Sequence, residues 1–194
     1  AALDNGFGIN TSFRVTRSRN YQGEIFPTCN GNVKITKRWV VDNPETGMYN
    51  MMRGTGQSVN NYFVPLEQAV GLCPVIKMAK KVGLQLASGE DLASEAYPSF
   101  TLGTADVTPL SMVTAYGTFA NRGVRCNPII IKSIITKDGK KLPIPQANCK
   151  RVIDAGVADA VNKVFQQPIY GPGATLSGMQ IPGYTLAGKT GTVP

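Results

Sequence analysis

The sequence predicts one α/β domain, in which helices are combined with short antiparallel strands. Apolar residues recur at helical spacing in several segments, and those segments begin and end at capping residues. An isoleucine-rich run before Asp138-Gly139 is typical of a β-hairpin. The length of 194 residues suits one domain with a sizeable core, and no internal repeat or linker-like stretch divides it.

Helices are predicted where apolar residues repeat every three or four positions. They cover residues 48–55, 60–70, 74–82, 108–123 and 154–166. Thr108 and Asp154 are suitable N-caps, and Pro109 stands in a first turn, where no amide donor is needed. Gly123 ends the helix that Thr108 begins, and Pro168 prevents the last helix from continuing. The many small and apolar residues after Thr108 predict that this helix is core scaffold.

Strands and loops fill the rest of the chain. Strands are predicted within residues 33–41, at 129–136 with 141–142, and at 186–192. The two middle segments form a hairpin around a two-residue Asp138-Gly139 turn. Most other residues before position 56, and residues 84–105, are rich in turn-forming types and are predicted to be loops.

The absence of histidine restricts the chemistry that the chain can perform. A Ser-His-Asp triad, a Cys-His pair and a His-ligated zinc site are all excluded. Acid–base work must therefore use lysine, carboxylate or tyrosine side chains. This exclusion favours a serine mechanism assisted by lysine.

The chain is basic, with a formal net charge of +8. Many of the basic residues lie early in the sequence, at Arg14, Arg17, Arg19, Lys34, Lys37 and Arg38. Aromatic residues are not interleaved with them as in nucleic-acid-binding modules, so we expect no nucleic-acid partner. The basic face is expected to be solvated or to contact anionic envelope material.

The sequence predicts neither a membrane span nor an export signal within this chain. No run of 18 apolar residues is present, and the N-terminus has no basic-then-apolar leader pattern. Residues 1–6 resemble the end of a helix entered midway, because Asn5-Gly6 is a typical helix stop. We therefore expect the chain to be an internal piece of a longer protein.

Four cysteines, Cys29, Cys73, Cys126 and Cys149, show no C-x-x-C spacing. This argues against metal and redox motifs, and the even number suits disulfides in an oxidising compartment. Cys126 and Cys149 bracket the predicted hairpin and are the best pair, which leaves Cys29 with Cys73. Four buried free thiols are the alternative.

Two short motifs carry the chemistry. In residues 186–192 a lysine, Lys189, stands between Gly188 and Gly191, and two threonines, Thr190 and Thr192, follow it. Glycines let a ligand approach a strand closely, while the lysine and the threonines supply one cation and two hydroxyl groups. Such a strand is suited to holding an acyl group and a carboxylate. The alternative is a polar edge strand without a ligand.

The second motif is Ser58-Val59-Asn60, which precedes Lys189-Thr190-Gly191 in the order found among penicillin-binding proteins and related β-lactamases. The surrounding segments extend the match: residues 57–64, 66–68, 70–72 and 118–123. Together they resemble the transpeptidase domain of bifunctional, class A penicillin-binding proteins of actinobacterial type. The resemblance covers nearly the whole chain, so residues 1–194 are expected to be part of one such domain, incomplete at both ends.

This resemblance implies a fold, an activity and partners. The fold is that of the penicilloyl serine transferases and serine β-lactamases, an antiparallel sheet flanked by helices. The activity is peptidoglycan D,D-transpeptidation, which cross-links the cell wall without a cofactor or metal. The implied ligands are stem peptides ending in D-Ala-D-Ala and the β-lactam antibiotics that mimic them. The parent protein is expected to be extracytoplasmic, anchored in the cell membrane outside this chain, with possible cell-wall synthesis partners.

Roles for individual residues also follow from the resemblance. Ser58 would relay a proton to the leaving group, and Asn60 would orient a lysine and the substrate amide. Lys189 would supply the positive field of the site. Thr190, Gly191 and Thr192 would bind substrate, with the two threonines on its terminal carboxylate and the Thr192 amide as an oxyanion donor. The alternatives are Ser58 as a helix cap and Thr190 as an ordinary strand residue.

The chain departs from the family pattern in one large respect. No serine in it is followed three residues later by lysine, so the Ser-x-x-Lys nucleophile is not in this chain. We therefore expect the chain alone to be inactive. Two further alternatives remain: a fragment of a serine β-lactamase or D,D-carboxypeptidase, and a non-catalytic wall-binding or regulatory module.

Overall fold

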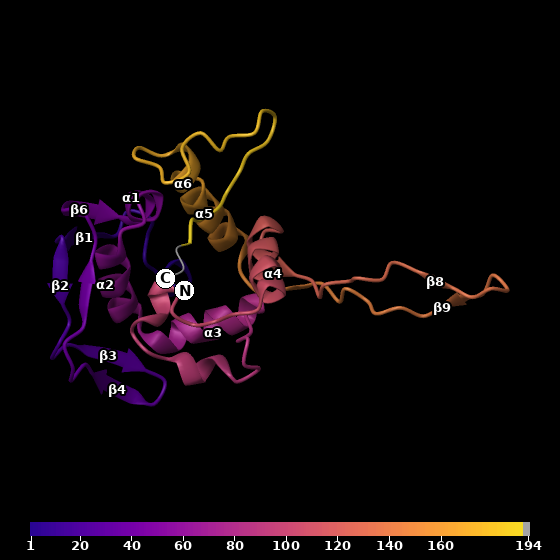
Figure 1. The fold of residues 1–194 in the computed structure, drawn as a ribbon, viewed down its shortest axis with the longest axis horizontal. Coiled ribbons are helices and arrows are strands. Elements are labelled where there is room, and N and C mark those ends of the chain that lie inside the picture. The colour runs from indigo at the N-terminus through magenta and orange to yellow at the C-terminus, as the bar shows by residue number, and fades with distance from the viewer. Residues whose placement is uncertain (192–194) are drawn as a thin grey trace.

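The computed structural model of the protein describes residues 1–191. Within this range the chain forms six α-helices and five two-stranded antiparallel ladders (Figure 1). The predicted combination of helices with antiparallel strands is therefore present. The strands are distributed over separate ladders instead of one continuous sheet.

Residues 12–50 form one long hairpin that is interrupted twice. The pairs, from its open end to its tip, are β1 (Ser12–Val15) with β6 (Gly47–Asn50), β2 (Ser18–Asn20) with β5 (Val40–Asp42), and β3 (Ile25–Thr28) with β4 (Gly31–Lys34). Val15 lies opposite Gly47, and Thr28 lies opposite Gly31 at the tip. Tyr21, Phe26 and Val41 are buried on the inner side.

The loop prediction for most of this region was wrong. Each strand has only three or four residues, which is too short for a clear alternation of apolar and polar side chains. The strand predicted within 33–41 is divided between β4 and β5. The helix predicted at 48–55 begins later, because residues 48–50 belong to β6 and the Asn50 side chain accepts from the N–H of Arg53 at 3.0 Å.

The other helices lie close to their predicted positions. The helices are α1 (Met51–Gly56), α2 (Asn60–Val70), α3 (Leu72–Val82), α4 (Pro109–Ala120), α5 (Ala155–Phe165) and α6 (Gln167–Tyr170), with 3₁₀ turns at Leu3–Asn5, Leu92–Glu95 and Phe100–Leu102. Thr108 caps α4 by accepting from the N–H of Ser111, and Asp154 caps α5 by accepting from the N–H of Gly156. Pro168 ends α5 as predicted but opens the short helix α6.

Helix α4 is only partly core scaffold. Ala115 is buried against Val82 of α3, and Thr118 is buried as well. On the opposite side of the helix, Leu110 and Val113 remain 53% and 67% exposed. The scaffold prediction therefore holds for one face of α4 in the structure.

A long arm projects from the body between α4 and α5 (Figure 1). It begins where β7 (Val124–Arg125) pairs with β10 (Lys150–Arg151) and continues to β8 (Ile134–Ile135) and β9 (Lys141–Leu142). The predicted two-residue turn was wrong: Ile135 pairs with Lys141, so five residues connect the strands, and the Thr136 hydroxyl accepts from the N–H of Lys140. Cys126 is joined to Cys149 at the base of the arm.

The C-terminal segment is not a strand in the part that the structure describes. Residues 185–191 belong to none of the five ladders. Their backbone is held instead by single contacts, such as the N–H of Gly188 donating to the carbonyl of Phe165 at 2.9 Å. A strand needs a paired neighbour for its amide groups, and residues 1–191 provide none beside this segment. The predicted edge strand is therefore absent from the described residues.

Candidate active site

Ser58, Val59 and Asn60 lie between helices α1 and α2, and the middle residue anchors the other two. Val59 is fully buried in a core cluster with Tyr62 and Val164. Because Val59 points inward, Ser58 and Asn60 are left partly exposed on either side of it. Ser58 has a φ of 58°, in the left-handed region that non-glycine residues rarely adopt. The Ser58 side chain is therefore presented at the surface by a buried valine and an unusual backbone conformation.

The start of α2 is held by polar groups that were not predicted from the sequence. Asn61 is buried, and its side chain donates to the carbonyls of Thr16 and Val41 and accepts from the Tyr21 hydroxyl. The N–H of Asn61 donates to the Asn43 side chain at 2.9 Å, so this distant asparagine, and not a residue of the motif, satisfies the helix end. The one sequence signal for this arrangement was Asn61 itself, a second asparagine directly after the motif.

Lys189 contacts Ser58 directly, although 131 positions separate them. The Nζ atom of Lys189 lies 2.7 Å from the Ser58 Oγ atom. The same ammonium donates to the Thr190 hydroxyl at 2.9 Å and to the Thr190 carbonyl at 3.1 Å. These three acceptors match the three donors of a lysine side chain. The two motifs that the sequence singled out therefore meet at one place on the molecule.

The electrostatic state of Lys189 follows from its surroundings. Its side chain is partly buried, and this burial lowers the pKa of the ammonium group from the usual value for lysine. The three ion pairs formed within residues 1–191 do not include it. Lys189 is thus a cation without a carboxylate partner in the described structure, which makes the site attractive to an anion.

The other predicted site residues have different positions. Asn60 donates to the carbonyl of Asp42 at 3.4 Å and makes no hydrogen bond to Lys189 among residues 1–191. Thr190 lies beside the lysine, and Gly191 is exposed at the end of the described chain. Thr192 lies outside the described residues. The disulfides Cys29–Cys73 and Cys126–Cys149 are the pairs that the sequence favoured.

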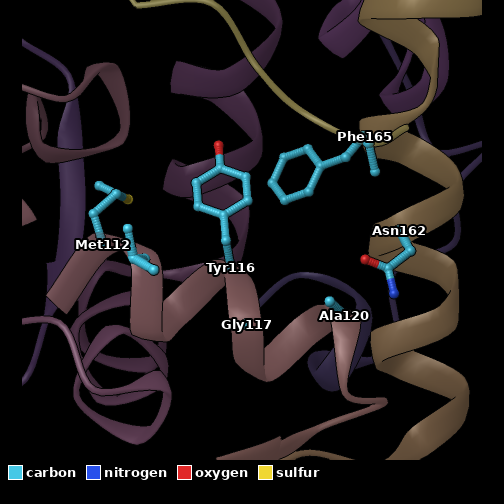
Figure 2. A pocket seen from close by; sticks show the side chains of 8 residues that line it. Met112, Tyr116, Gly117, Ala120, Asn162 and Phe165 are labelled. Atoms are coloured by element: carbon cyan, nitrogen blue, oxygen red, sulfur yellow. The ribbon is translucent and has the colours of Figure 1, made fainter. Parts of the chain in front are cut away.

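An apolar groove of about 380 Å³ lies beside the C-terminal segment, between α4 and α5 (Figure 2). Its lining comprises Met112, Val113, Tyr116, Gly117, Ala120, Asn162, Phe165 and Ala187. The rings of Tyr116 and Phe165 are stacked with centroids 5.4 Å apart. Neither Ser58 nor Lys189 lines this groove, so the polar site and the groove are separate features.

Two kinds of site have no counterpart in the described structure. Among residues 1–191, no cluster of three histidine, cysteine, aspartate or glutamate side chains is arranged to bind a metal ion. No helix in the same range combines the length and the apolar character that a membrane span requires.

Comparisons with known proteins identify the family and the fold of the chain. Residues 8–193 match the family of the penicillin binding protein transpeptidase domain. Penicillin-binding protein 1A/1B of Bacillus subtilis is 32% identical over 162 residues, which are 83% of this chain and 17% of the relative. PbpB of Mycobacterium tuberculosis is 29% identical over 188 residues, covering 84% of this chain and 26% of the relative.

A solved structure of penicillin binding protein 3 from Mycobacterium tuberculosis shares the fold. It superposes with a TM-score of 0.73 at 23% identity and covers 97% of this chain and 44% of its own. The chain therefore spans less than half the length of these relatives. The predicted fold class and the predicted family are confirmed, and the 1A/1B relative agrees with the class A resemblance. This chain belongs to the family of penicillin-binding protein transpeptidase domains.

Proposed function

We propose that the protein containing this chain is a peptidoglycan D,D-transpeptidase that cross-links stem peptides and is acylated by β-lactams. The observation that carries the proposal is the contact of 2.7 Å between Lys189 and Ser58. It joins the two motifs across 131 positions, as a shared active site requires. The structural neighbour from Mycobacterium tuberculosis has been solved in complex with aztreonam and with ampicillin, which supports the same ligand class for this protein.

The described groups suit a proton relay. Because the Lys189 ammonium donates to the Ser58 Oγ atom, the hydroxyl proton of Ser58 is directed toward another acceptor. In the proposed reaction that acceptor is the nitrogen of the leaving D-alanine, which must gain a proton as the acyl-enzyme forms. The positive charge of Lys189 stabilises the anionic substrate and favours Ser58 as a donor.

The remaining roles concern substrate binding and the nucleophile. Thr190, Gly191 and Thr192 would bind the terminal carboxylate and the backbone of the donor peptide, and Asn60 would turn from Asp42 toward the substrate amide. No serine within the 194 residues is followed by lysine at the third position. The acylated serine and its lysine base would therefore come from another part of the protein, and the chain alone would not turn over substrate.

An extracytoplasmic location accompanies this function. The stem peptides are outside the cytoplasmic membrane, and the two disulfides of the chain suit an oxidising compartment. A membrane anchor and partners in cell-wall synthesis would belong to parts of the protein outside this chain.

Covalent labelling by a fluorescent penicillin tests the proposal in the longer protein. The wild type should be labelled, and Lys189→Ala should lower the second-order acylation rate about 100-fold or more, because it removes the cation that stabilises the reacting group. Lys77→Ala, at an exposed lysine of α3, is the matched control and should react as the wild type does. An unlabelled wild type, or equal rates for Lys189→Ala, would contradict the proposal. Labelling of Ser58 in the 194-residue chain alone would contradict the relay role.

A further inference from the structure

The loop at residues 171–175 is fixed to the backbone next to Ser58. The N–H of Thr175 donates to the carbonyl of Gly56 at 3.2 Å, two residues before the serine. On the other side of the loop, the side chain of Gln57 donates to the carbonyl of Pro172 at 3.1 Å. These contacts tie the turn to the motif loop from two directions.

The tie is part of the folded core and does not depend on a ligand. Gln57 is oriented by the hydroxyl of Tyr49, which donates to its Oε1 atom at 2.9 Å, and Tyr49 is only 3% exposed. Gly173 has a φ of 68°, and a Cβ atom there would lie 2.8 Å from the Gln57 Nε2 atom. A side chain at position 173 would displace the Gln57 amide, so glycine permits this close approach, which places Thr175.

Thr175 thereby reaches the lysine site. Its Oγ1 atom lies 3.4 Å from the Oγ1 atom of Thr190, which in turn lies 2.9 Å from the Nζ atom of Lys189. A separation of 3.4 Å is long for a hydrogen bond between hydroxyls. However, two hydroxyls at this spacing can both donate to a third oxygen placed about 2.8 Å from each. Thr175 is also exposed, so an incoming oxygen can reach it.

We propose that Thr175 is a binding residue for the carboxylate of the ligand, with Thr190 as the second hydroxyl donor and Lys189 as the cation. The inference rests on the proposed function, since it assigns a further contact to the same site. A carboxylate oxygen accepts hydrogen bonds only, which suits two hydroxyl donors beside an ammonium that has no carboxylate partner among residues 1–191. A neutral ester oxygen at the same place would gain much less from the contact.

The test compares a fluorescent penicillin with its carboxyl methyl ester in the longer protein. Thr175→Val should lower the acylation rate constant for the free acid about ten-fold, the usual effect of losing a hydrogen bond to a charged group. The rate constant for the ester should stay within about two-fold of the wild type, because the ester lacks the charge that the hydroxyl recognises. Thr175→Ser keeps the hydroxyl and should restore the rate for the free acid.

Ser177→Ala, two residues after Thr175, is the matched control, since the exposed Ser177 hydroxyl makes no hydrogen bond among residues 1–191. It should leave both rates unchanged.

An unlabelled wild type would refute the proposed function itself. A labelled wild type with unchanged rates in Thr175→Val would refute only the role of Thr175. Equal losses for the acid and the ester would show that Thr175 orders the loop and does not bind the carboxylate. The hydrogen bond that fixes Thr175 to the Gly56 carbonyl uses the backbone N–H of Thr175, so Thr175→Val and Thr175→Ser both keep it.

Discussion

Residue 58 combines a backbone strain with a place in the candidate site. A φ of 58° costs a serine on the order of 1 kcal/mol relative to glycine. The surrounding structure sustains this cost, because the N–H of Val59 donates to the carbonyl of Gly54 at 2.9 Å and the Val59 side chain is fully buried. A serine is kept at a position that glycine would fill with less strain, which is expected where the hydroxyl itself is needed.

Glu67, on the buried side of α2, is a second unusual residue. Its side chain is 3% exposed, and neither carboxylate oxygen accepts a hydrogen bond of normal geometry among residues 1–191. Burial raises the pKa of Glu67 to about 8, and the nearby backbone of Thr101 opposes the shift only in part. The native protein therefore keeps this carboxyl protonated where the unfolded chain, with its ordinary pKa of 4.5, is ionised.

We predict that Glu67 makes the protein less stable as the pH rises from about 4.5 to about 8. In this window the native state binds more protons than the unfolded state, so the free energy of unfolding falls by at most about 1.4 kcal/mol per pH unit. Glu67→Gln removes the titrating group. The free energy of unfolding of this variant, relative to that of the wild type, should therefore be about 3 kcal/mol higher at pH 8 than at pH 5. Urea unfolding of both proteins at the two pH values measures this difference.

The control for this prediction is Glu90→Gln, at an exposed glutamate. Its difference from the wild type should be the same at pH 5 and pH 8. If the difference between Glu67→Gln and the wild type were also independent of pH, Glu67 would be ionised in the native protein and the interpretation would be wrong.

At the scale of elements, the end of α4 depends on close backbone packing. Gly123 has a φ of 85°, and its carbonyl accepts from the N–H of Val152 at 2.9 Å. A Cβ atom at Gly123 would overlap the carbonyl oxygen of Ile153. The chain that returns from the arm is therefore packed against α4 through a position without a side chain.

We predict that Gly123→Ala lowers the free energy of unfolding by about 3 kcal/mol or more, through the left-handed conformation and the overlap together. Gly178→Ala is the matched control: its φ is 87°, but no atom lies within 4 Å of the added Cβ. The control should lose only about 1–2 kcal/mol, the cost of the conformation alone. Guanidinium unfolding distinguishes the two, and equal losses would show that the overlap is relieved by movement of the backbone.

The elements that could be predicted are those whose signals are local. Thr108 and Asp154 cap α4 and α5 through their own side chains, so a few consecutive residues identified both helix starts. Pairing between Val15 and Gly47 brings together residues 32 positions apart in strands of four residues, and nothing in either strand indicates the other. The strand predicted around Lys189 had local features of a strand but has no pairing partner in the described chain.

At the scale of the whole molecule, two disulfides reinforce two different parts of the fold. Cys29, at the tip of the β3–β4 pair, is joined to Cys73 in α3 across a sequence separation of 44. Cys126 and Cys149 close the arm across a separation of 23. The first bond ties the strand-rich N-terminal part to the helices, and the second confines the arm at its base.

We predict that removing the first bond costs more than removing the second. From the loop lengths alone, Cys29→Ala with Cys73→Ala should cost roughly 4 kcal/mol, and Cys126→Ala with Cys149→Ala roughly 3 kcal/mol. Denaturant unfolding of the two double variants under oxidising conditions measures both values. A negligible cost for the 29–73 pair would show that the contacts between β3 and α3 hold these parts together without the covalent bond.

In the candidate site, too, motif residues could be predicted from the sequence, whereas residues brought in by tertiary contacts could not. The identity of Ser58 and Lys189 followed from motifs, and the structure brings them together. Thr175 could not be identified from the sequence, because its position depends on Tyr49, Gln57 and the space left by Gly173, which come from three parts of the chain. Motifs identify the residues that perform general chemistry, whereas tertiary packing selects their neighbours.

The ammonium of Lys189 has one further property. Its three N–H bonds already end on oxygen atoms of Ser58 and Thr190, so an incoming anion can only exchange with one of these and cannot add to them. The count of hydrogen bonds is then the same before and after binding. We therefore expect any ligand preference of this site to come from replacing a neutral oxygen by a charged one, that is, from charge more than from shape.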